Sequence, residues 1–432
     1  MHVQNQSHHA TLSKVFSELA VLFLLCVPCV KAQSPLLVNE HEYLDSEALD
    51  VLVHHTHYDQ YFGDQKIQGI EFIHHGARTV TNGDVRLSPT PEQWDPVPVF
   101  GERTVDSTAQ RVSATLTYED FDFTYTVSAK PEGDGVLVSV QLDEPVPNGL
   151  EGRAGFNMEF LPSAYFEKTY VIGDQTGVFP RHPTGPMHHS DATDRLEASP
   201  LASGSSMVLA PGDPNHRIHI DGRGHELSLY DGRNRAQNGW YVVRSELPTG
   251  ETGTVLEWYV EPNRKSDWVR TPTILHSQLG YPPNQQKDAL LEMSPHYDAP
   301  ETARLLRLST NGEYEEQMSG PAESRGSYKR YEYAEFDFTN VTQPGLYVIE
   351  YGDVRSETFR ISDDIYDNSV WSSTLDTFMP VQMDHVRVND RYRVWHGVSH
   401  LDDARQAPAD HTHFDGYAQM DSTDTQYEDG EH

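Results

Sequence analysis

Residues 111–130 read RVSATLTYEDFDFTYTVSAK, and this stretch decides the fold class of the first half of the chain. Apolar and polar residues alternate on both sides of Glu119 and Asp120, which is the pattern of a β-strand with one face on a core. The alternation returns in GVLVSVQL, residues 135–142. We therefore predict successive antiparallel strands joined by tight turns.

Turn-forming residues separate the other strand-like runs of this region. Asn-Gly and Asp-Gly pairs are typical of hairpin turns, because these residues tolerate positive φ angles. Such segments occur at Asn82-Gly83, Glu132 to Gly135, Asp221-Gly222 and Asp231-Gly232. The pattern predicts an antiparallel β-sandwich over residues 33–270, an accessory domain of unknown role.

The stretch from residue 179 to 200 has no clear period and predicts a long surface loop. It contains His182, His188 and His189. Imidazole is a common metal ligand, but nothing in the pattern fixes the geometry of these three side chains. We favour solvated loop histidines over a metal site here.

A second β-rich unit begins at TPTILHSQLGYPPNQQKDALLEMS, residues 271–294. Four short alternating runs follow it: ARLLRLS, YAEFDFTNV, LYVIEYG and ETFRIS. Gln343-Pro344-Gly345 indicates a hairpin turn, because proline presets one turn dihedral and glycine accepts the next. Short strands at this spacing predict an immunoglobulin-like β-sandwich over residues 271–362.

The hydrophobic period changes after Asp363 and Asp364, a pair suited to a helix N-terminus. Apolar residues then recur at helical spacing: Val370, Trp371, Leu375, Phe378, Met379, Met383 and Val386. Pro380 should kink or end this helix locally. Residues 363–432 are therefore predicted to open an α-helical domain, with the apolar stripe as a buried core face.

The N-terminus has the pattern of a secretory signal peptide. Lys14 precedes the apolar run LAVLFLLCVPCV, residues 19–30, and small residues stand before Gln33. The run is short for a membrane span, so we favour residues 1–32 as a cleaved signal over a permanent anchor, and expect a secreted or periplasmic protein. Cys26 and Cys29 lie inside it, so the mature chain would have no cysteine for a disulfide or a thiolate metal site.

The charge balance restricts the classes of partner. The chain has 32 lysines and arginines against 66 aspartates and glutamates, a net charge of −34. This charge repels the phosphates of nucleic acids and anionic lipid headgroups. We expect no nucleic-acid partner and no membrane partner after signal cleavage, and a neutral substrate fits better.

Two stretches carry a resemblance to a known family. ILHSQLGYPPNQQKDAL, residues 274–290, and YAEFDFTNVTQPGLYVIEYGDVRSETFRISDDIYD, residues 333–367, resemble the immunoglobulin-like domain that precedes the catalytic domain in many family 9 glycoside hydrolases, the cellulase group. VWSSTLDTFMPVQMDHVRVNDRYRVWHGVSHLDDA, residues 370–404, is similar to the first helix and following loop of that family's (α/α)6 barrel. The resemblance covers roughly residues 271–432. It implies a multidomain, mostly β chain: an N-terminal β-sandwich, an immunoglobulin-like β-sandwich, and the truncated start of an (α/α)6 barrel over residues 363–432.

The resemblance implies inverting hydrolysis of β-1,4-glucan such as cellulose, in polysaccharide degradation. One carboxyl group would activate a water and a second would protonate the leaving oxygen. In the family the base lies in an Asp-Ala-Gly-Asp motif and the acid is a glutamate near the end of the barrel. Neither motif occurs in these 432 residues. We therefore expect the catalytic residues to lie beyond His432, and the chain as given to be a fragment without activity.

Residues 394–417, VWHGVSHLDDARQAPADHTHFDGY, are dense in histidine and aspartate. Some family members bind a structural zinc nearby through two cysteines and neighbouring histidines. Those cysteine positions correspond to Asp384 and Ser399 here, while His400 keeps the match. A structural zinc or calcium site remains one alternative for this stretch. Its candidate ligands are Asp384, His385, His396 and His400.

The same stretch has other interpretations, which we favour over the metal site. Asp402, Asp403 and Asp415 could cap loop backbone. Aromatic and imidazole side chains could pack locally or form a rim that faces a sugar. The candidates for such a rim are Trp395, His396, His400, Phe414 and Tyr417.

A different class of function is the alternative: a non-catalytic carbohydrate-binding or scaffold protein that acts through its N-terminal sandwich. DGRNRAQNGWYVVRS, residues 231–245, holds Arg233, Arg235 and Trp240, which could meet a sugar carboxylate or ring. Packing of Trp240 beside surface arginines is the simpler interpretation. A histidine-based metal-binding protein is a third and weaker alternative.

Overall fold

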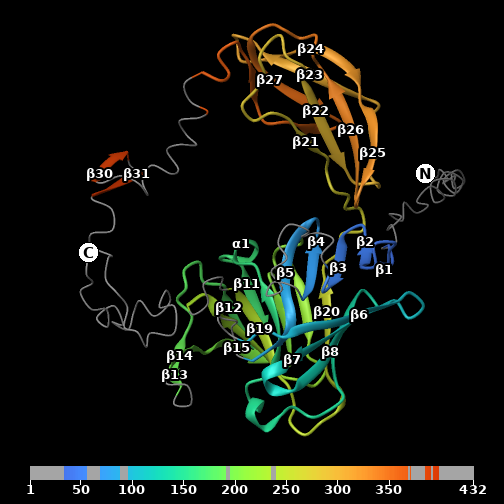
Figure 1. Ribbon diagram of the computed structural model, residues 1–432, viewed down its shortest axis with the longest axis vertical. Helices are drawn as coiled ribbons and strands as arrows, with labels where there is room; N and C mark the ends of the chain where they lie inside the picture. The colour runs from blue at the N-terminus through green and yellow to red at the C-terminus, as the bar shows by residue number, and fades with distance from the viewer. Residues whose placement is uncertain are drawn as a thin grey trace, which may run out of the picture. The chain divides into compact units, whose positions relative to one another are not determined.

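The structure is a computed structural model that describes residues 34–55, 69–87, 96–190, 195–234, 240–367, 370, 385–390 and 393–397. Strands dominate these residues, in agreement with the predicted mostly β fold (Figure 1). Within them no helical barrel is present. The helical elements with full bounds are α1 (Pro162–Tyr165) and the short 3-10 helices η2 (Glu119–Phe121), η3 (Asn148–Leu150) and η4 (Gly232–Asn234). Across the same residues, no helix has the length and apolar character needed to cross a bilayer.

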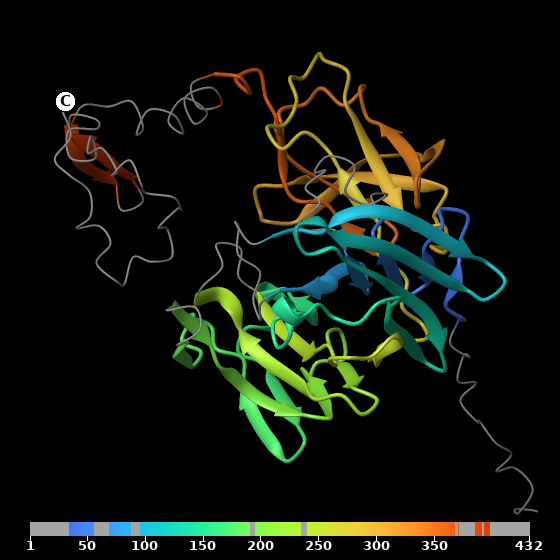
Figure 2. The same cartoon turned by 60° about the horizontal axis from the view of Figure 1, so that its bottom comes forward.

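The N-terminal sandwich consists of two antiparallel sheets, each with nine strands in the described part of the chain (Figures 1 and 2). The first sheet has the order β1 (Leu37–Val38), β2 (Leu44–Ser46), β3 (Leu49–Val53), β4 (Ile70–His74), β5 (Ala77–Arg86), β10 (Gly155–Phe160), β19 (Tyr241–Glu246), β18 (Leu227–Asp231) and β15 (Pro200–Gly204). The second has the order β12 (Gln175–Val178), β11 (Thr169–Ile172), β16 (Ser206–Leu209), β17 (Ile218–Asp221), β20 (Gly253–Pro262), β9 (Gly135–Leu142), β8 (Phe123–Glu132), β7 (Arg111–Tyr118) and β6 (Val99–Asp106).

The stretch that predicted this fold forms a hairpin as expected. Strands β7 and β8 pair without a shift from Val112 opposite Ala129 to Tyr118 opposite Phe123. Side chains along β7 alternate between buried and more exposed. The turn uses η2 and Asp122, whose φ of 49° closes the hairpin. The period-two pattern was therefore a correct local signal.

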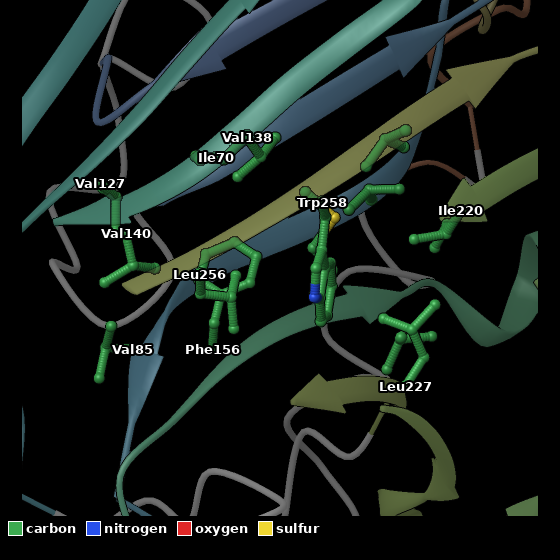
Figure 3. Packing of buried hydrophobic residues seen from close by; sticks show 14 of the residues in the cluster. Ile70, Val85, Val127, Val138, Val140, Phe156, Ile220, Leu227, Leu256 and Trp258 are labelled. Atoms are coloured by element: carbon green, nitrogen blue, oxygen red, sulfur yellow. The ribbon is translucent and has the colours of Figure 1, made fainter. Parts of the chain in front are cut away.

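Apolar side chains from both sheets fill the space between them (Figure 3). Trp258 of β20 is fully buried and meets Phe156 of β10 edge to face, with ring centroids 4.9 Å apart. The indole nitrogen of Trp258 donates a hydrogen bond to the Ser245 hydroxyl at 3.1 Å. Full burial of a large apolar side chain typically stabilises a fold by about 1.5–3 kcal/mol, so the apolar layer between the sheets stabilises the sandwich.

Two predictions in this region are wrong. Asn82-Gly83 is not a turn but lies inside β5, where the chain makes a bulge. The stretch from residue 179 to 200 is not a loop throughout, because β13 (Met187–Ser190) pairs with β14 (Arg195–Ala198) in a two-stranded sheet. In both cases the residues suit either structure, and pairing with a distant or neighbouring segment decides between them.

The immunoglobulin-like sandwich has its own two sheets and its own core, as predicted (Figure 2). One sheet has the order β21 (Thr273–Leu275), β22 (Asp288–Met293), β26 (Tyr331–Asp337) and β25 (Glu323–Tyr328). The other has β24 (Tyr314–Pro321), β23 (Thr302–Leu308), β27 (Gly345–Tyr351) and β28 (Val354–Arg355), and β29 (Phe359–Ile361) pairs with β27. Gln343-Pro344-Gly345 is not a hairpin turn, because it joins β26 in one sheet to β27 in the other.

The LGYPPN segment of this domain is a fixed loop. Gly280 has a φ of 101°, and an added Cβ would strike the backbone oxygen of Arg360. The backbone nitrogen of Tyr281 donates a hydrogen bond to the Arg360 carbonyl at 2.9 Å. The Tyr281 carbonyl accepts one from the Ser362 nitrogen at 3.1 Å. Its hydroxyl donates to the Asp288 carbonyl at 2.7 Å. The loop therefore joins the start of β22 to the end of β29, two segments far apart in sequence.

The C-terminal region departs from the helical prediction where the structure describes it. Val386, the last residue of the expected apolar stripe, lies in β30 (His385–Asp390), which pairs with β31 (Arg393–Gly397). The helix expected from residue 370 onward cannot therefore continue through Val386. The other residues of that stripe, apart from Val370, lie outside the described residues.

Candidate functional site

A bulge in β5 brings polar residues together on the first sheet of the N-terminal sandwich. Against β4, the pairing shifts between Ile70 opposite Gly83 and Phe72 opposite Val80. Against β10, it shifts between Asn157 opposite Asp84 and Glu159 opposite Thr81. A bulge leaves residues unpaired and turns their side chains to a new direction, and such bulges are common beside functional sites.

The residues of the bulge fit this backbone. Asn82 has a φ of 51°, a conformation that asparagine tolerates better than most residues. At Gly83, an added Cβ would lie 2.7 Å from the Cβ of Ile70, so a larger residue does not fit. The Asn-Gly pair is thus required by the bulge, and it fixes the position of the Asn82 side chain.

We call the group formed by Asn82, Asp84 and Arg86 of β5, Glu159 of β10 and His54 after β3 the bulge cluster. Asn82 Nδ2 donates a hydrogen bond to Glu159 Oε2 at 2.6 Å. His54 Nε2 lies 4.0 Å from Asp84 Oδ2, beyond hydrogen-bond length. All five residues are at most 6% exposed, which is unusual for so many polar side chains.

Asp84 is held in place from the core side of the sandwich. The hydroxyl of the fully buried Tyr125 donates to Asp84 Oδ1 at 2.9 Å, and the backbone nitrogen of Val85 donates to the same oxygen at 2.8 Å. Desolvation by burial raises the pKa of the Tyr125 hydroxyl, and Asp84 raises it further, so Tyr125 stays a donor. The orientation of the Asp84 carboxylate is therefore fixed.

Glu159 Oε1, Asn82 Oδ1 and His54 Nε2 are buried polar atoms of the bulge cluster that have no hydrogen-bond partner among the residues that the structure describes. Burial of such an atom without a partner typically costs about 1–3 kcal/mol. Buried polar atoms without partners are few in native proteins, and each calls for a functional or structural explanation.

Burial also controls the charges of the cluster. Desolvation raises the pKa of Glu159 to about 7, although Arg86 and the Asn82 hydrogen bond act in the opposite direction. Burial lowers the pKa of His54, so its imidazole is neutral. Burial disfavours the charged form of Arg86, but the combined effect of Asp84, Tyr118, Glu159 and Tyr125 outweighs burial, and the pKa of Arg86 is raised. Glu159 can therefore hold or release a proton near neutral pH.

The pKa of Glu159 leads to a testable pH dependence of stability. Its folded-state pKa of about 7 lies above the ordinary value of 4.5, so the folded protein holds a proton that the unfolded chain loses between these pH values. The free energy of unfolding should therefore fall by about 3 kcal/mol between pH 4.5 and 7 from this group alone. The measurement is denaturant unfolding of wild type and Glu159→Gln at pH 4.5 and pH 8.

The variant has no ionisable group at this position and serves as its own control. Wild type should lose more stability than Glu159→Gln between the two pH values. Parallel pH profiles for the two proteins would contradict the assignment of a buried, proton-holding Glu159.

The described part of the predicted C-terminal site is a two-stranded ribbon. His385 pairs with Gly397, Val386 pairs with His396, and Arg387 pairs with Trp395. His396 therefore lies on β31. The other predicted site residues lie outside the described residues: Asp384, Ser399, His400, Asp402, Asp403, Phe414, Asp415 and Tyr417.

The arginine and tryptophan of residues 231–245 have structural surroundings where they are described. The Arg233 guanidinium binds the Asp231 carboxylate at 2.8 Å and donates to the backbone oxygens of Pro180, Arg181 and His182. It also lies over the Tyr241 ring. Trp240 is half-buried, and Arg235 lies outside the described residues. Arg233 therefore anchors a loop and is not presented to a sugar.

The histidines of the β13–β14 region are exposed, and His188 Nδ1 lies 3.0 Å from the Ser199 hydroxyl. Within the described ranges, no group of three or more His, Cys, Asp or Glu side chains is arranged to hold a metal ion.

Comparison with known proteins places one of these domains in a family. Residues 269–356 match the family model of the cellulase N-terminal Ig-like domain. This part of the chain is an immunoglobulin-like domain of the type found in family 9 cellulases, as the sequence motifs predicted. No curated protein matches the chain.

Solved structures give partial matches. A metagenome-derived glycoside hydrolase family 9 endoglucanase is 24% identical, with a TM-score of 0.25, and the match covers 33% of this chain and 27% of that one. The GH9 protein of Bacteroides ovatus is 22% identical, with a TM-score of 0.23 and coverage of 31% and 23%. The chain thus spans about a quarter of the length of these proteins.

Proposed function

We propose that this chain takes part in the degradation of β-1,4-glucan such as cellulose outside the cytoplasm, as the part of a family 9 type glycoside hydrolase that carries the immunoglobulin-like domain. The observation that supports the proposal is the match over residues 269–356, together with a complete two-sheet sandwich and core over the same residues. In this proposal the immunoglobulin-like domain supports a catalytic domain and makes no catalytic contact.

The proposal assigns the chemistry to residues that this sequence does not contain. Inverting hydrolysis needs a carboxylate base and a carboxylic acid on opposite sides of the glycosidic bond. The 432 residues include no Asp-Ala-Gly-Asp motif for the base. Residues 363–432 are proposed as the beginning of the (α/α)6 catalytic domain, and the described hairpin β30–β31 would belong to a connection within it.

A gene disruption tests the proposed function in the host cell. Loss of the gene should slow growth on β-1,4-glucan as sole carbon source and leave growth on glucose unchanged, because only the polymer needs hydrolysis before uptake. A complemented strain is the control. Equal growth of wild type and disrupted strain on the polymer would contradict a role in β-glucan degradation.

Export is part of the same proposal. Residues 1–32 would be removed after Ala32, since the apolar run and the small residues before Gln33 fit a signal peptidase site. The mass of the exported protein should correspond to a chain that begins at Gln33. A mass that retains Cys26 and Cys29 would show that the segment is not a cleaved signal.

A second candidate function is non-catalytic carbohydrate binding by the N-terminal sandwich. One observation favours it: Glu159 Oε1, Asn82 Oδ1 and His54 Nε2 of the bulge cluster are buried and lack hydrogen-bond partners among the described residues. This candidate is compatible with the first, because accessory domains of polysaccharide-degrading enzymes can bind sugar while another domain cleaves it.

A further inference from the structure

The hairpin of β4 and β5 contains two adjacent histidines, His74 and His75. His74 ends β4 and pairs with Ala77, so His75 and Gly76 form the turn between the strands. The φ angles of His75 and Gly76 are 50° and 73°. A hairpin turn with two positive φ angles strongly favours Asn-Gly, so the backbone alone does not explain a histidine at the first position. A residue held in such a conformation calls for a role of its side chain.

The two imidazole rings attach residues 263–268, the segment that follows β20. The rings of His74 and His75 stack with their centroids 4.2 Å apart. His74 Nε2 lies 2.8 Å from the backbone oxygen of Asn263. The backbone nitrogen of Lys265 lies 3.2 Å from His75 Nε2. The stacked pair therefore joins this segment to the β4–β5 turn.

The partners of the two rings fix where their protons lie. A backbone N–H can only donate, so His75 Nε2 accepts from Lys265 and carries no proton. A backbone carbonyl can only accept, so His75 Nδ1 carries the proton and donates to Asn215 at 3.2 Å. By the same argument His74 Nε2 donates to Asn263. His75 is therefore neutral, with both nitrogens in use.

An added proton would break this attachment. On His75 it would go to Nε2, where it would face the Lys265 N–H, donor against donor, so this hydrogen bond would be lost. On His74 it would go to Nδ1, a buried atom without a hydrogen-bond partner among the described residues. Burial lowers the pKa of both imidazoles, that of His74 to about 3. The folded chain thus excludes protons from both rings.

The charged groups around the pair do not offset this exclusion. The Lys265 ammonium and the His216 imidazole act against a positive charge on His75. Asp213 acts in favour of that charge. The Asp213 carboxylate, however, already binds the Lys168 ammonium at 2.6 Å and His216 Nδ1 at 2.8 Å. Burial and the neighbouring cations therefore favour neutral rings.

We infer that His74 and His75 form an acid-sensitive clamp, which holds residues 263–268 on the N-terminal sandwich while both rings are neutral and releases them when the rings gain protons. Each folded-state pKa lies below the ordinary value of 6.5, so the clamp has its full stability above pH 6.5 and loses it as the pH falls below that value. The match to the immunoglobulin-like domain begins at residue 269, so acid would loosen the segment that leads into that domain. The inference does not depend on the proposed hydrolase function.

Hydrogen–deuterium exchange of the full chain, followed by mass spectrometry of the peptide that covers residues 263–268, measures the clamp. The exchange rate divided by the intrinsic rate at each pH gives the extent of local opening. In wild type this opening should rise about tenfold or more from pH 7.5 to pH 5.0, because the released histidines bind protons that the clamped ones exclude. Unfolding of the whole chain is a poorer readout, because Glu159 changes its stability in the opposite direction over this range.

His75→Asn separates the clamp from the folding of the hairpin. Asparagine suits the positive φ of position 75, but it cannot gain a proton and is too short to span both backbone partners of the ring. The segment should therefore already be about tenfold or more open at pH 7.5, with a smaller further rise at pH 5.0. His296→Asn, at an exposed histidine of the immunoglobulin-like domain, is the matched control and should behave as wild type does.

Two results would overturn the inference. One is equal opening of residues 263–268 in wild type at pH 7.5 and pH 5.0. The other is a His75→Asn variant that keeps the full pH-dependent rise of wild type, because another group would then control the segment. No glucan and no hydrolysis enter these measurements, so a negative result leaves the proposed hydrolase function standing.

Discussion

Replacement of Gly280 by alanine is expected to lower the free energy of unfolding of the immunoglobulin-like sandwich by about 4 kcal/mol or more. Gly280 has a φ of 101°, which residues with a side chain rarely adopt. The new Cβ would also strike the Arg360 backbone oxygen, which accepts the hydrogen bond from the Tyr281 nitrogen. The chain cannot relieve this contact without separating the loop from the end of β29. Denaturant unfolding followed by near-UV circular dichroism measures the effect.

Gly312 provides the matched control for this prediction. It also has a positive φ, 88°, but an added Cβ would meet no atom within 4 Å. Gly312→Ala should therefore cost only the backbone strain, about 1–2 kcal/mol. Equal losses of unfolding free energy in Gly280→Ala and Gly312→Ala would contradict this prediction. In that case the close packing of the loop against Arg360 would not explain the glycine in the LGYPPN segment.

Local patterns explain the parts of the fold that could be predicted from the sequence. The alternation in residues 111–130 depends on each side chain lying on one of two faces, and β7 and β8 have the predicted pattern. In the immunoglobulin-like domain, the motif around Gly280 and Tyr281 reflects specific backbone contacts, so it could be identified from its residues. In both cases the signal is contained in a short stretch.

The features that could not be predicted depend on partners distant in sequence. Asn-Gly suits a turn and a bulge equally, because both need a positive φ, and only pairing with β4 and β10 selects the bulge. The burial of Glu159 follows from coverage of both faces of the sheet, which alternation alone does not reveal. A weak signal was present, since NGDVR places Asp84 and Arg86 on either side of Val85 within a strand-like run.

The C-terminal hairpin illustrates a competition between two periods. Val386 fits the helical spacing that starts at Val370, but Val386 and Val388 also alternate with the polar residues His385, Arg387 and Asn389, and a second short run from Arg393 to Gly397 follows. The structure pairs these two runs as β30 and β31. The helical pattern was extended too far because its last member belongs to the next element.

The second prediction with a large expected effect concerns the rate at which this chain hydrolyses β-glucan. Assistance by a general acid or base is typically worth about 10²–10⁴-fold for each group, so a chain without both should hydrolyse β-glucan at close to the uncatalysed rate. Asp402, Asp403 and Asp415 are carboxylates in the region similar to the start of the barrel, but a carboxylate is catalytic only when an enclosing site holds it across the sugar from its partner. The proposal therefore expects these 432 residues to support hydrolysis without performing it.

Release of reducing ends from a soluble β-1,4-glucan by the purified 432-residue chain tests this central claim most directly. The proposal predicts a rate equal to that of the buffer control, with no change in Asp403→Asn or Asp415→Asn. Sustained turnover by the chain that disappears in either variant would contradict it, and would place the active site within residues 394–417.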